Sequence, residues 1–171
     1  MSTTVTPLDY YLHETWDPDR EYINGEILER NMGEKDHAAW QVALVAALRE
    51  WRQRANIRVF SELRLQTTQA NFRIPDVMAI DRNAPDEQII THPPLLCVEI
   101  LSPEDRFSAL EDKIAEYFRM GVRAVWVIDP RKQAAYQCEG AAFQQWRPAT
   151  ALKIPDTPVH IELAALIADL D

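Results

Sequence analysis

Two carboxylates interrupt apolar segments that are typical of buried strands. Asp76 directly precedes the apolar run 77–80, and Glu99 lies inside the run 95–101. A buried carboxylate is costly unless it is neutralised, hydrogen-bonded or bound to a cation. A hard divalent cation such as Mg²⁺ would stabilise both, because it prefers carboxylate and main-chain carbonyl oxygens. The carbonyl of Ile100, next to Glu99, is a third candidate ligand.

The same charges also have a structural interpretation. Asp76 and Glu99 could face the edge of a sheet, or they could pair with Arg73 and Lys113. Lys113 flanks the apolar stripe of the helix that is expected after the Glu99 strand, so its ammonium could reach back toward that strand. There it could position a water or stabilise charge on a phosphate. It could equally be a surface lysine paired with an acidic neighbour on its helix.

Apolar periodicity and turn signals predict the elements that would hold these side chains. Helices are expected at 7–14, 36–54, 108–120 and 161–170, and strands at 56–60, 62–67, 74–80, 95–101 and 122–128. Hairpins are expected around Asn24-Gly25 and around Glu139-Gly140, the second joining 134–138 to 142–146. Residues 69–72 are interpreted as a turn and 81–94 as an exposed connection.

The order of strand 95–101, helix 108–120 and strand 122–128 predicts a right-handed crossover between two parallel strands. The first of these strands is apolar throughout except for Glu99, which is typical of a central strand covered on both faces. No repeat, low-complexity tract or linker is evident. We therefore expect one domain of mixed α/β type that spans residues 1–171.

The composition excludes several classes of protein. A net charge of −9 argues against nonspecific coating of nucleic acid, although a local basic groove or a metal ion is compatible with an acidic total. The two cysteines, Cys97 and Cys138, offer neither a disulfide framework nor a zinc spacing. Residues 1–6 lack the features of a signal peptide, and no stretch approaches roughly 18 apolar residues. We expect a soluble cytoplasmic protein without membrane contact.

Several pieces of sequence form a specific pattern when they are taken in order. They are EYINGE at 21–26, His37, IPD at 74–76, CVEILSP at 97–103, and the stretch from Asp112-Lys113 to Asp129-Pro130. This string resembles the Uma-type restriction endonuclease family, a branch of the PD-(D/E)XK nuclease superfamily, and the resemblance spans roughly residues 8–146.

The resemblance implies a restriction-endonuclease-like core, with a mixed central sheet flanked by helices on both faces. It also implies phosphodiester hydrolysis that depends on Mg²⁺ or Mn²⁺, since such a cation polarises phosphate and lowers the pKa of a bound water. Asp76 and Glu99 match the acidic metal ligands of the family. Lys113 would be a migrated lysine, because Leu101 occupies the usual lysine position two residues after Glu99.

Two further residues resemble the N-terminal residues that complete such sites. They are Glu26, in the first hairpin, and His37, at the start of the next helix. Glu26 could instead be a solvated hairpin residue, and His37 a capping or core histidine. Both interpretations stay open on the sequence.

The expected function is a metal-dependent endonuclease that acts on DNA. The alternative is a catalytically inactive nuclease-fold protein that binds nucleic acid or protein, which the acidic total charge favours. A hydrolase with Ser102 or Cys97 as nucleophile has little support, because neither residue lies in a nucleophile elbow or near a suitably spaced histidine. We also expect a homodimer, since cutting both strands of a duplex favours two copies.

Overall fold

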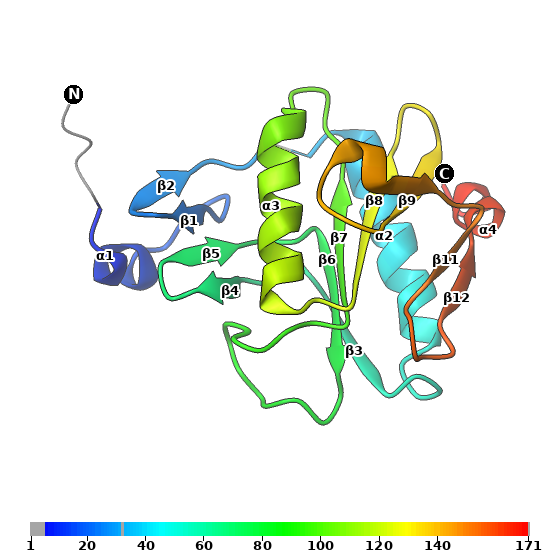
Figure 1. The fold of residues 1–171 in the computed structure, drawn as a ribbon, viewed down its shortest axis with the longest axis horizontal. Helices are drawn as coiled ribbons and strands as arrows, with labels where there is room; N and C mark the ends of the chain where they lie inside the picture. Colours follow the sequence, from blue (N-terminus) through cyan, green and yellow to red (C-terminus); the bar gives the residue numbers. More distant parts are fainter. Residues whose placement is uncertain (1–5, 32, 171) are drawn as a thin grey trace.

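A six-stranded mixed sheet forms the centre of the computed structural model, which describes residues 6–31 and 33–170 (Figure 1). Its strand order is β10-β9-β8-β7-β6-β3. The bounds are β3 Ile57–Ser61, β6 Val77–Asp81, β7 Leu96–Ile100, β8 Ala124–Asp129, β9 Ala134–Cys138 and β10 Trp146–Pro148. Strands β7 and β8 are parallel, whereas the other neighbours are antiparallel. The sequence prediction of a central β7 and a parallel crossover is confirmed.

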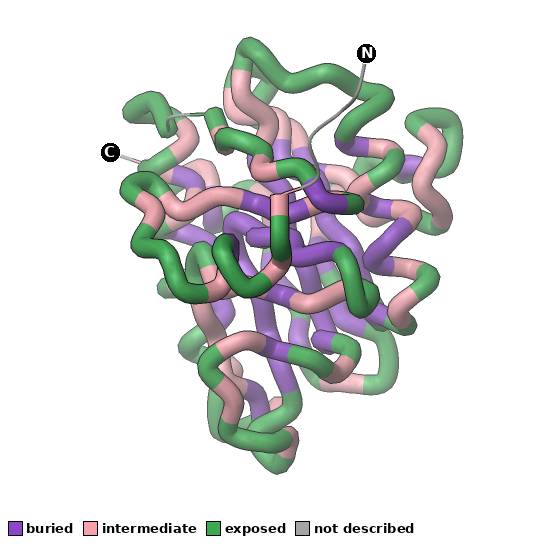
Figure 2. Tube along the Cα trace, turned by 90° about the vertical axis from the view of Figure 1, so that its left-hand side faces the viewer, coloured by how far each residue is buried: buried purple, intermediate pink, exposed green. Residues whose placement is uncertain are grey.

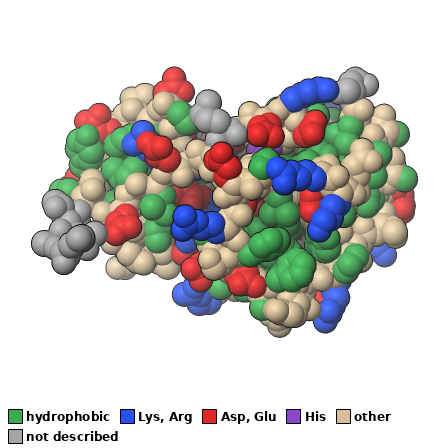
Figure 3. Space-filling view, turned by 90° about the horizontal axis from the view of Figure 1, so that it is seen from above, with side chains coloured by type: hydrophobic (Ala, Val, Ile, Leu, Met, Phe, Trp, Pro, Cys, Tyr) green, Lys and Arg blue, Asp and Glu red, His purple; other side chains and the backbone are tan. Residues whose placement is uncertain are grey.

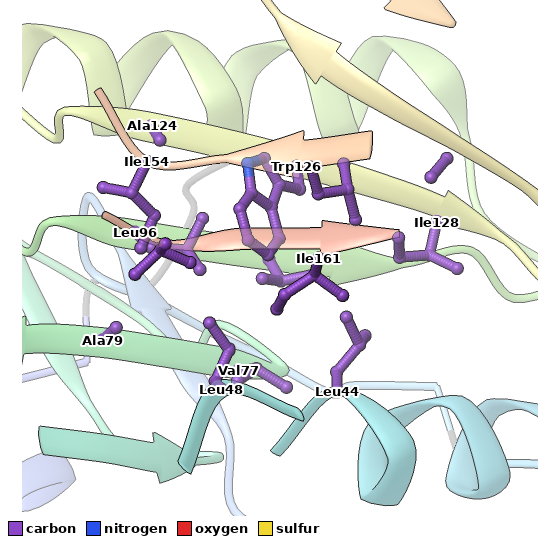
Figure 4. Close-up of a cluster of buried hydrophobic side chains, with 14 of the residues drawn as sticks. Leu44, Leu48, Val77, Ala79, Leu96, Ala124, Trp126, Ile128, Ile154 and Ile161 are labelled. Atoms are coloured by element: carbon purple, nitrogen blue, oxygen red, sulfur yellow. The ribbon is translucent and has the colours of Figure 1, made fainter. Parts of the chain in front are cut away.

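Alternation of side chains along the strands gives the sheet two apolar faces. On one face, residues such as Val98 and Trp126 pack against α2 (Lys35–Glu50). On the other face, Cys97 and its neighbours pack against α3 (Phe107–Met120). Figure 4 shows the first of these clusters, and Figure 2 shows the buried strands running through the middle of the molecule. The expected fold class, a mixed sheet with helices on both faces, is therefore confirmed.

The crossover from β7 to β8 depends on how α3 ends. Gly121 adopts φ 100°, a left-handed conformation that glycine reaches without steric cost, and its N–H bonds to the last turn of the helix. The chain then enters β8 in register with β7, so that Glu99 lies opposite Val127. Glu99 alternates with Val98 and Ile100 and thus points to the same face as Cys97, where α3 lies.

A second, four-stranded sheet has the order β2-β1-β5-β4 and contains the N-terminal hairpin. Its strands are β1 Glu21–Ile23, β2 Glu26–Leu28, β4 Leu65–Thr68 and β5 Asn71–Arg73. The predicted Asn24-Gly25 turn is confirmed, with positive φ at both residues. Helix α1 (Leu8–His13) packs Tyr11 against aromatic side chains of this sheet.

A two-stranded sheet and a short helix complete the fold. Strands β11 (Ala151–Lys153) and β12 (His160–Glu162) pair with each other, and α4 (Leu163–Ala168) packs with them onto the α2 side of the central sheet. None of the helices in the described part of the chain is long and apolar enough to cross a membrane.

Several predicted boundaries are wrong, and each error has a physical reason. Residues 69–72, expected as a turn, include most of β5, which is too short to show a periodic pattern but pairs on both sides. Strand β10 starts only at Trp146, after a 3-10 turn, and the expected C-terminal helix begins with β12. Helix α2 ends at Glu50 rather than near residue 54. The connection 81–94 is not wholly exposed, because Ile90 is buried and bridges to Leu65.

Candidate active site

A cavity of about 480 Å³ lies where the two larger sheets meet the ends of α2 and α3. Five predicted site residues line it: Asp76, Glu99 and Ile100 from the central sheet region, His37 from α2 and Lys113 from α3. Figure 3 views this side of the molecule and shows acidic and basic side chains gathered around a hollow. The fold therefore brings together residues that are up to 76 positions apart (113 − 37).

Asp76 lies at the entrance to β6 and is held from both sides. Its Oδ2 accepts a hydrogen bond from the Ile100 N–H at 2.7 Å, while its Oδ1 lies 3.0 Å from Arg30 Nη2 and 3.4 Å from His37 Nε2. Burial alone would raise the pKa of Asp76, but the bond to His37 and the charge of Lys113 outweigh it and lower the pKa. The carboxylate is therefore ionised at neutral pH.

Glu99 is a buried carboxylate that is bonded through both of its oxygens. Its Oε2 accepts a hydrogen bond from Lys113 Nζ at 2.9 Å, and its Oε1 accepts one from the Tyr117 hydroxyl at 2.6 Å. Burial raises the pKa of Glu99 to about 7, although Lys113 pulls it down; the nearby charge of Asp76 adds to the rise. The positive groups around Glu99 therefore compensate its ionised form only in part.

Lys113 is positioned by three oxygen acceptors. Its Nζ lies 2.8 Å from Glu21 Oε1 and 2.9 Å from Glu99 Oε2, and it donates to the Ile74 carbonyl at 3.3 Å. Burial would lower the pKa of Lys113, but the carboxylates of Glu21, Glu99 and Asp76 together raise it above its usual value. Lys113 is therefore a charged, fixed ammonium at the wall of the cavity, and not a solvated surface lysine.

Glu21, at the start of β1, is a site residue that sequence reasoning missed. Besides Lys113, it contacts Arg73 through Oε2 at 3.1 Å and accepts a hydrogen bond from the Ile74 N–H at 2.9 Å. Burial would raise the pKa of Glu21, but the positive charges of Lys113 and Arg73 lower it. The signal for Glu21 was present in the quoted hairpin pattern, in which it stands five residues before Glu26.

Glu26, the predicted hairpin residue, is not brought to the cavity. It pairs with Ile23 beside the turn, and its side chain is exposed. Glu21 and Glu26 share one face of the hairpin, because directly paired residues point to the same side, but Glu26 sits two positions further toward the turn. This offset amounts to roughly 7 Å along the hairpin, and Glu21 lines the cavity whereas Glu26 is not among its lining residues.

His37 does reach the site from the first turn of α2. Its pKa is raised, chiefly because Nε2 interacts with the Asp76 carboxylate, although burial opposes this. Its interaction explains why a histidine lies at this end of the helix. The expectation that His37 belongs to the site comes from the resemblance, and its contact with Asp76 is visible only in the structure.

The donor chemistry of the cavity can be compared with the needs of a hard divalent cation. Asp76, Glu99 and Ile100 line one cavity, and carboxylate and carbonyl oxygens with water are the ligand set that Mg²⁺ and Mn²⁺ prefer. Within residues 6–31 and 33–170, no three His, Cys, Asp or Glu side chains converge as a ready metal-binding group. The oxygens of Asp76, Glu99 and Ile100 therefore fit a cation that is also bound by water. In this structure Arg30 neutralises the charge of Asp76.

Comparisons with known proteins place this fold in a class. A solved structure described as a "putative nuclease belonging to DUF820", from Anabaena variabilis, is similar with a TM-score of 0.81 and 23% identity, covering 96% of this chain and 98% of that chain. The chain therefore shares the fold of that protein.

The family follows from the sequence match. The model of the Uma2 family, described as "Putative restriction endonuclease", matches residues 8–166, and the chain belongs to this family. A DrdV–DNA complex studied by cryo-electron microscopy is more distantly similar, with a TM-score of 0.42, 15% identity and coverage of 81% of this chain and 12% of that chain. Among curated proteins, none matches this chain significantly.

Proposed function

We propose that this protein is an endonuclease that hydrolyses phosphodiester bonds in DNA with the help of Mg²⁺ or Mn²⁺. Membership in a restriction endonuclease family supports the reaction class. The observation that carries the proposal is the meeting of Asp76, Glu99 and Lys113 in one cavity, with the ammonium 2.9 Å from Glu99 although it comes from a different element. A carboxylate pair with a fixed ammonium is the minimal equipment for metal-assisted phosphate chemistry.

In this proposal the cation would be held by Asp76, Glu99 and the Ile100 carbonyl. When bound, it would supply Lewis-acid polarisation of the phosphate and a water of lowered pKa. The raised pKa of Glu99, about 7, supports a further positive charge at this place, because an added cation would favour the ionised carboxylate.

The other residues have positioning roles in the proposal. Tyr117 and Lys113 fix the two oxygens of Glu99, and Glu21 holds Lys113 at the cavity wall. Lys113 would orient the attacking water or stabilise the charge that develops on the phosphate. His37 would orient Asp76. Glu26 stays outside this set, because it is an exposed residue near the hairpin turn.

Basic residues near the cavity support a nucleic-acid substrate despite the acidic total charge. Arg30 and Arg106 line the main cavity, and Arg131 and Lys132 line a neighbouring cavity of about 230 Å³ that shares part of its wall. Such groups can position a phosphate backbone without reading sequence. We propose duplex DNA as the substrate and a homodimer as the cutting unit, since a single proposed active site in each chain would cut one strand of the duplex.

A second candidate function is a binding module that has lost turnover. The contacts that favour it are those that occupy the carboxylates, Arg30 on Asp76 and Lys113 on Glu99, together with the net charge of −9. This candidate predicts nucleic-acid or protein binding without cleavage under any metal condition. The first candidate predicts cleavage that depends on the cation.

A cleavage assay separates the two candidates. Purified protein would be incubated with supercoiled plasmid, duplex and single-stranded oligonucleotides and RNA, in Mg²⁺, Mn²⁺ or EDTA. We expect cleavage of duplex DNA only with a divalent cation, and a loss of at least about 100-fold in Asp76→Ala and in Glu99→Ala. Glu50→Gln, an exposed change at the end of α2, is the control that should cleave normally. Cleavage that persists undiminished in both cavity variants would identify a contaminating nuclease and defeat the proposal.

A further inference from the structure

Arg30 makes a contact at the heart of the cavity that the proposed chemistry does not use. Its Nη2 lies 3.0 Å from Asp76 Oδ1, and the two side chains are only 16% and 7% exposed. Its second acidic neighbour, Glu62, is 3.9 Å away and half exposed. Arg30 therefore neutralises a carboxylate that the proposed function assigns to a metal ion.

The two oxygens of Asp76 are held in different ways. Oδ2 accepts a hydrogen bond from the main chain of Ile100, which belongs to the sheet and cannot leave without disturbing it. Among residues 6–31 and 33–170, the groups that contact Oδ1 are the side chains of Arg30 and His37. The carboxylate can therefore keep its orientation through Oδ2 while Oδ1 exchanges one cation for another.

The segment that carries Arg30 is held by side-chain contacts, which include an ion pair between Glu29 and Arg20 at 2.9 Å. Residues 29–31 follow β2 and belong to no helix or strand. Asn31 Nδ2 donates to Asp105 Oδ1 at 2.8 Å, an exposed hydrogen bond between two residues that line the cavity. Side-chain contacts of this kind break at far lower cost than the ladder of a sheet. Arg30 can therefore move while the sheet that holds Asp76 stays in place.

We propose that Arg30 is a displaceable counter-ion, which competes with the divalent cation for Asp76 and, once displaced, binds a phosphate of the substrate. This inference rests on the proposed function and adds a means of regulating it. A guanidinium and a divalent cation repel each other at one carboxylate oxygen. A phosphate offers the guanidinium a better partner, since the planar fork binds its oxygens bidentately.

The competition makes metal and substrate binding reinforce each other. A phosphate that takes up Arg30 frees Asp76 for the cation, and by thermodynamic reciprocity the cation promotes phosphate binding by the same factor. Without substrate, Arg30 would keep the metal affinity low and the enzyme idle. A purely structural Arg30 has the opposite signature, because its removal would weaken the site or leave metal affinity unchanged.

Mn²⁺ titration by calorimetry distinguishes these two roles on the full chain without measuring activity. We expect Arg30→Met to bind Mn²⁺ about 5- to 100-fold more tightly than wild type, the range typical of coupling between two ligands. Arg106→Met is the matched control, since Arg106 lines the same cavity with an exposed side chain, and it should tighten binding by only about twofold. Asp76→Asn should abolish Mn²⁺ binding both in wild type and in Arg30→Met.

A second titration tests the link to phosphate. In the Lys113→Met background, where cleavage should be about 100- to 10,000-fold slower, a short DNA duplex should increase the Mn²⁺ affinity, and adding Arg30→Met should remove that increase. If Arg30→Met fails to fold by circular dichroism, Arg30→Gln supplies the same comparison while keeping a polar side chain.

Two results would overturn the inference, and they differ in what else they overturn. Equal or weaker Mn²⁺ binding by the Arg30 variant, with wild type binding normally, would reject the competition and leave the proposed nuclease function intact. Failure of wild type and every Arg30 variant to bind Mn²⁺ at millimolar concentration would reject the metal site, and with it both proposals.

Discussion

Lys113 and Arg73 are two buried cations that share one carboxylate, Glu21, yet their surroundings differ. Arg73 lies in β5 and binds Glu116 with two parallel hydrogen bonds, from Nη2 at 2.6 Å and from Nε at 3.1 Å, and reaches Glu21 with Nη1. Lys113 instead lies between Glu21 and Glu99 and donates to a single carbonyl. The Arg73 guanidinium is thus held by several directional hydrogen bonds, whereas the Lys113 ammonium is a point charge between two carboxylates.

The difference indicates a division of roles across Glu21. A planar guanidinium with its donors paired is suited to joining elements, and the Arg73 guanidinium connects the four-stranded sheet to α3 through Glu116. A compact ammonium is a concentrated point charge, which suits a group that stabilises charge on a phosphate. We therefore expect Arg73 to matter mainly for stability and Lys113 mainly for turnover.

Replacing Lys113 should have the largest effect, and it should be on activity. We expect Lys113→Met to lower the cleavage rate by about 100- to 10,000-fold, the range for a removed group that transfers a proton or stabilises charge. Stability should change less than in Arg73→Met, because Glu99, whose pKa is already about 7, can take up a proton when its cation is gone, and Glu21 keeps its pair with Arg73. Single-turnover cleavage and urea unfolding measure the two quantities. A stable variant with normal cleavage would contradict the assigned role.

Replacing Arg73 should act on stability. Arg73→Met leaves Glu21 and Glu116 buried without their guanidinium, and breaking a buried pair in this way costs about 3–5 kcal/mol in the free energy of unfolding. The matched control is Arg147→Met, which removes the exposed pair with Glu139 and should cost less than about 1 kcal/mol. Urea unfolding curves give both values. Equal losses of unfolding free energy in the two variants would show that the buried Arg73 pairs contribute no more to stability than an exposed pair.

The Arg73 side of the comparison should also respond to pH. Burial would raise the pKa of Glu116, but its hydrogen bond and charge interaction with Arg73 outweigh burial and lower the pKa below the ordinary 4.5. A lowered folded-state pKa contributes stability that is present above the unfolded-state pKa and is lost as the pH falls through the folded-state value. The difference in unfolding free energy between wild type and Glu116→Gln should therefore be constant above about pH 5.5 and shrink as the pH falls toward 3. A difference that grows on acidification would refute this.

The two hairpin glutamates give the smallest effects and the sharpest control. Glu21→Gln should reduce cleavage by about tenfold, since a neutral amide positions Lys113 less well. Glu26→Gln should change neither cleavage nor stability beyond about 0.5 kcal/mol, because its side chain is exposed. Parallel cleavage and unfolding measurements on the two variants test this. An equal loss of activity in both would return Glu26 to the site.

The central fold could be predicted because its signals are local. The apolar run of β7, the amphipathic α3 and the positive φ of Gly121 each leave a clear mark in the sequence, and together they define the crossover. Strand β5 left no such mark. Its three residues are ordered by pairing with β1 and β4, which are themselves distant in sequence.

The site was predictable where the residues that form it lie on those strong elements. Asp76, Glu99 and Lys113 flank or occupy β6, β7 and α3, so their meeting follows from the crossover and the resemblance. Glu21 and Arg30 could not be placed in the same way. They lie in the N-terminal hairpin and just after it, and no local sequence signal indicates that this part of the four-stranded sheet packs beside the cavity. The hydroxyl of Tyr117 was missed for a different reason. Its ring belongs to the apolar stripe of α3, and only the structure reveals the hydrogen bond to Glu99.

The most direct test of the central claim, that Asp76 and Glu99 together hold one catalytic cation, is anomalous diffraction from crystals grown with Mn²⁺. We predict one strong anomalous peak per chain in contact with a carboxylate oxygen from each of the two residues, and its absence in crystals of Glu99→Gln. Absence of a peak between these carboxylates in well-ordered crystals of both wild type and Arg30→Met, or the same peak retained in Glu99→Gln, would contradict the claim.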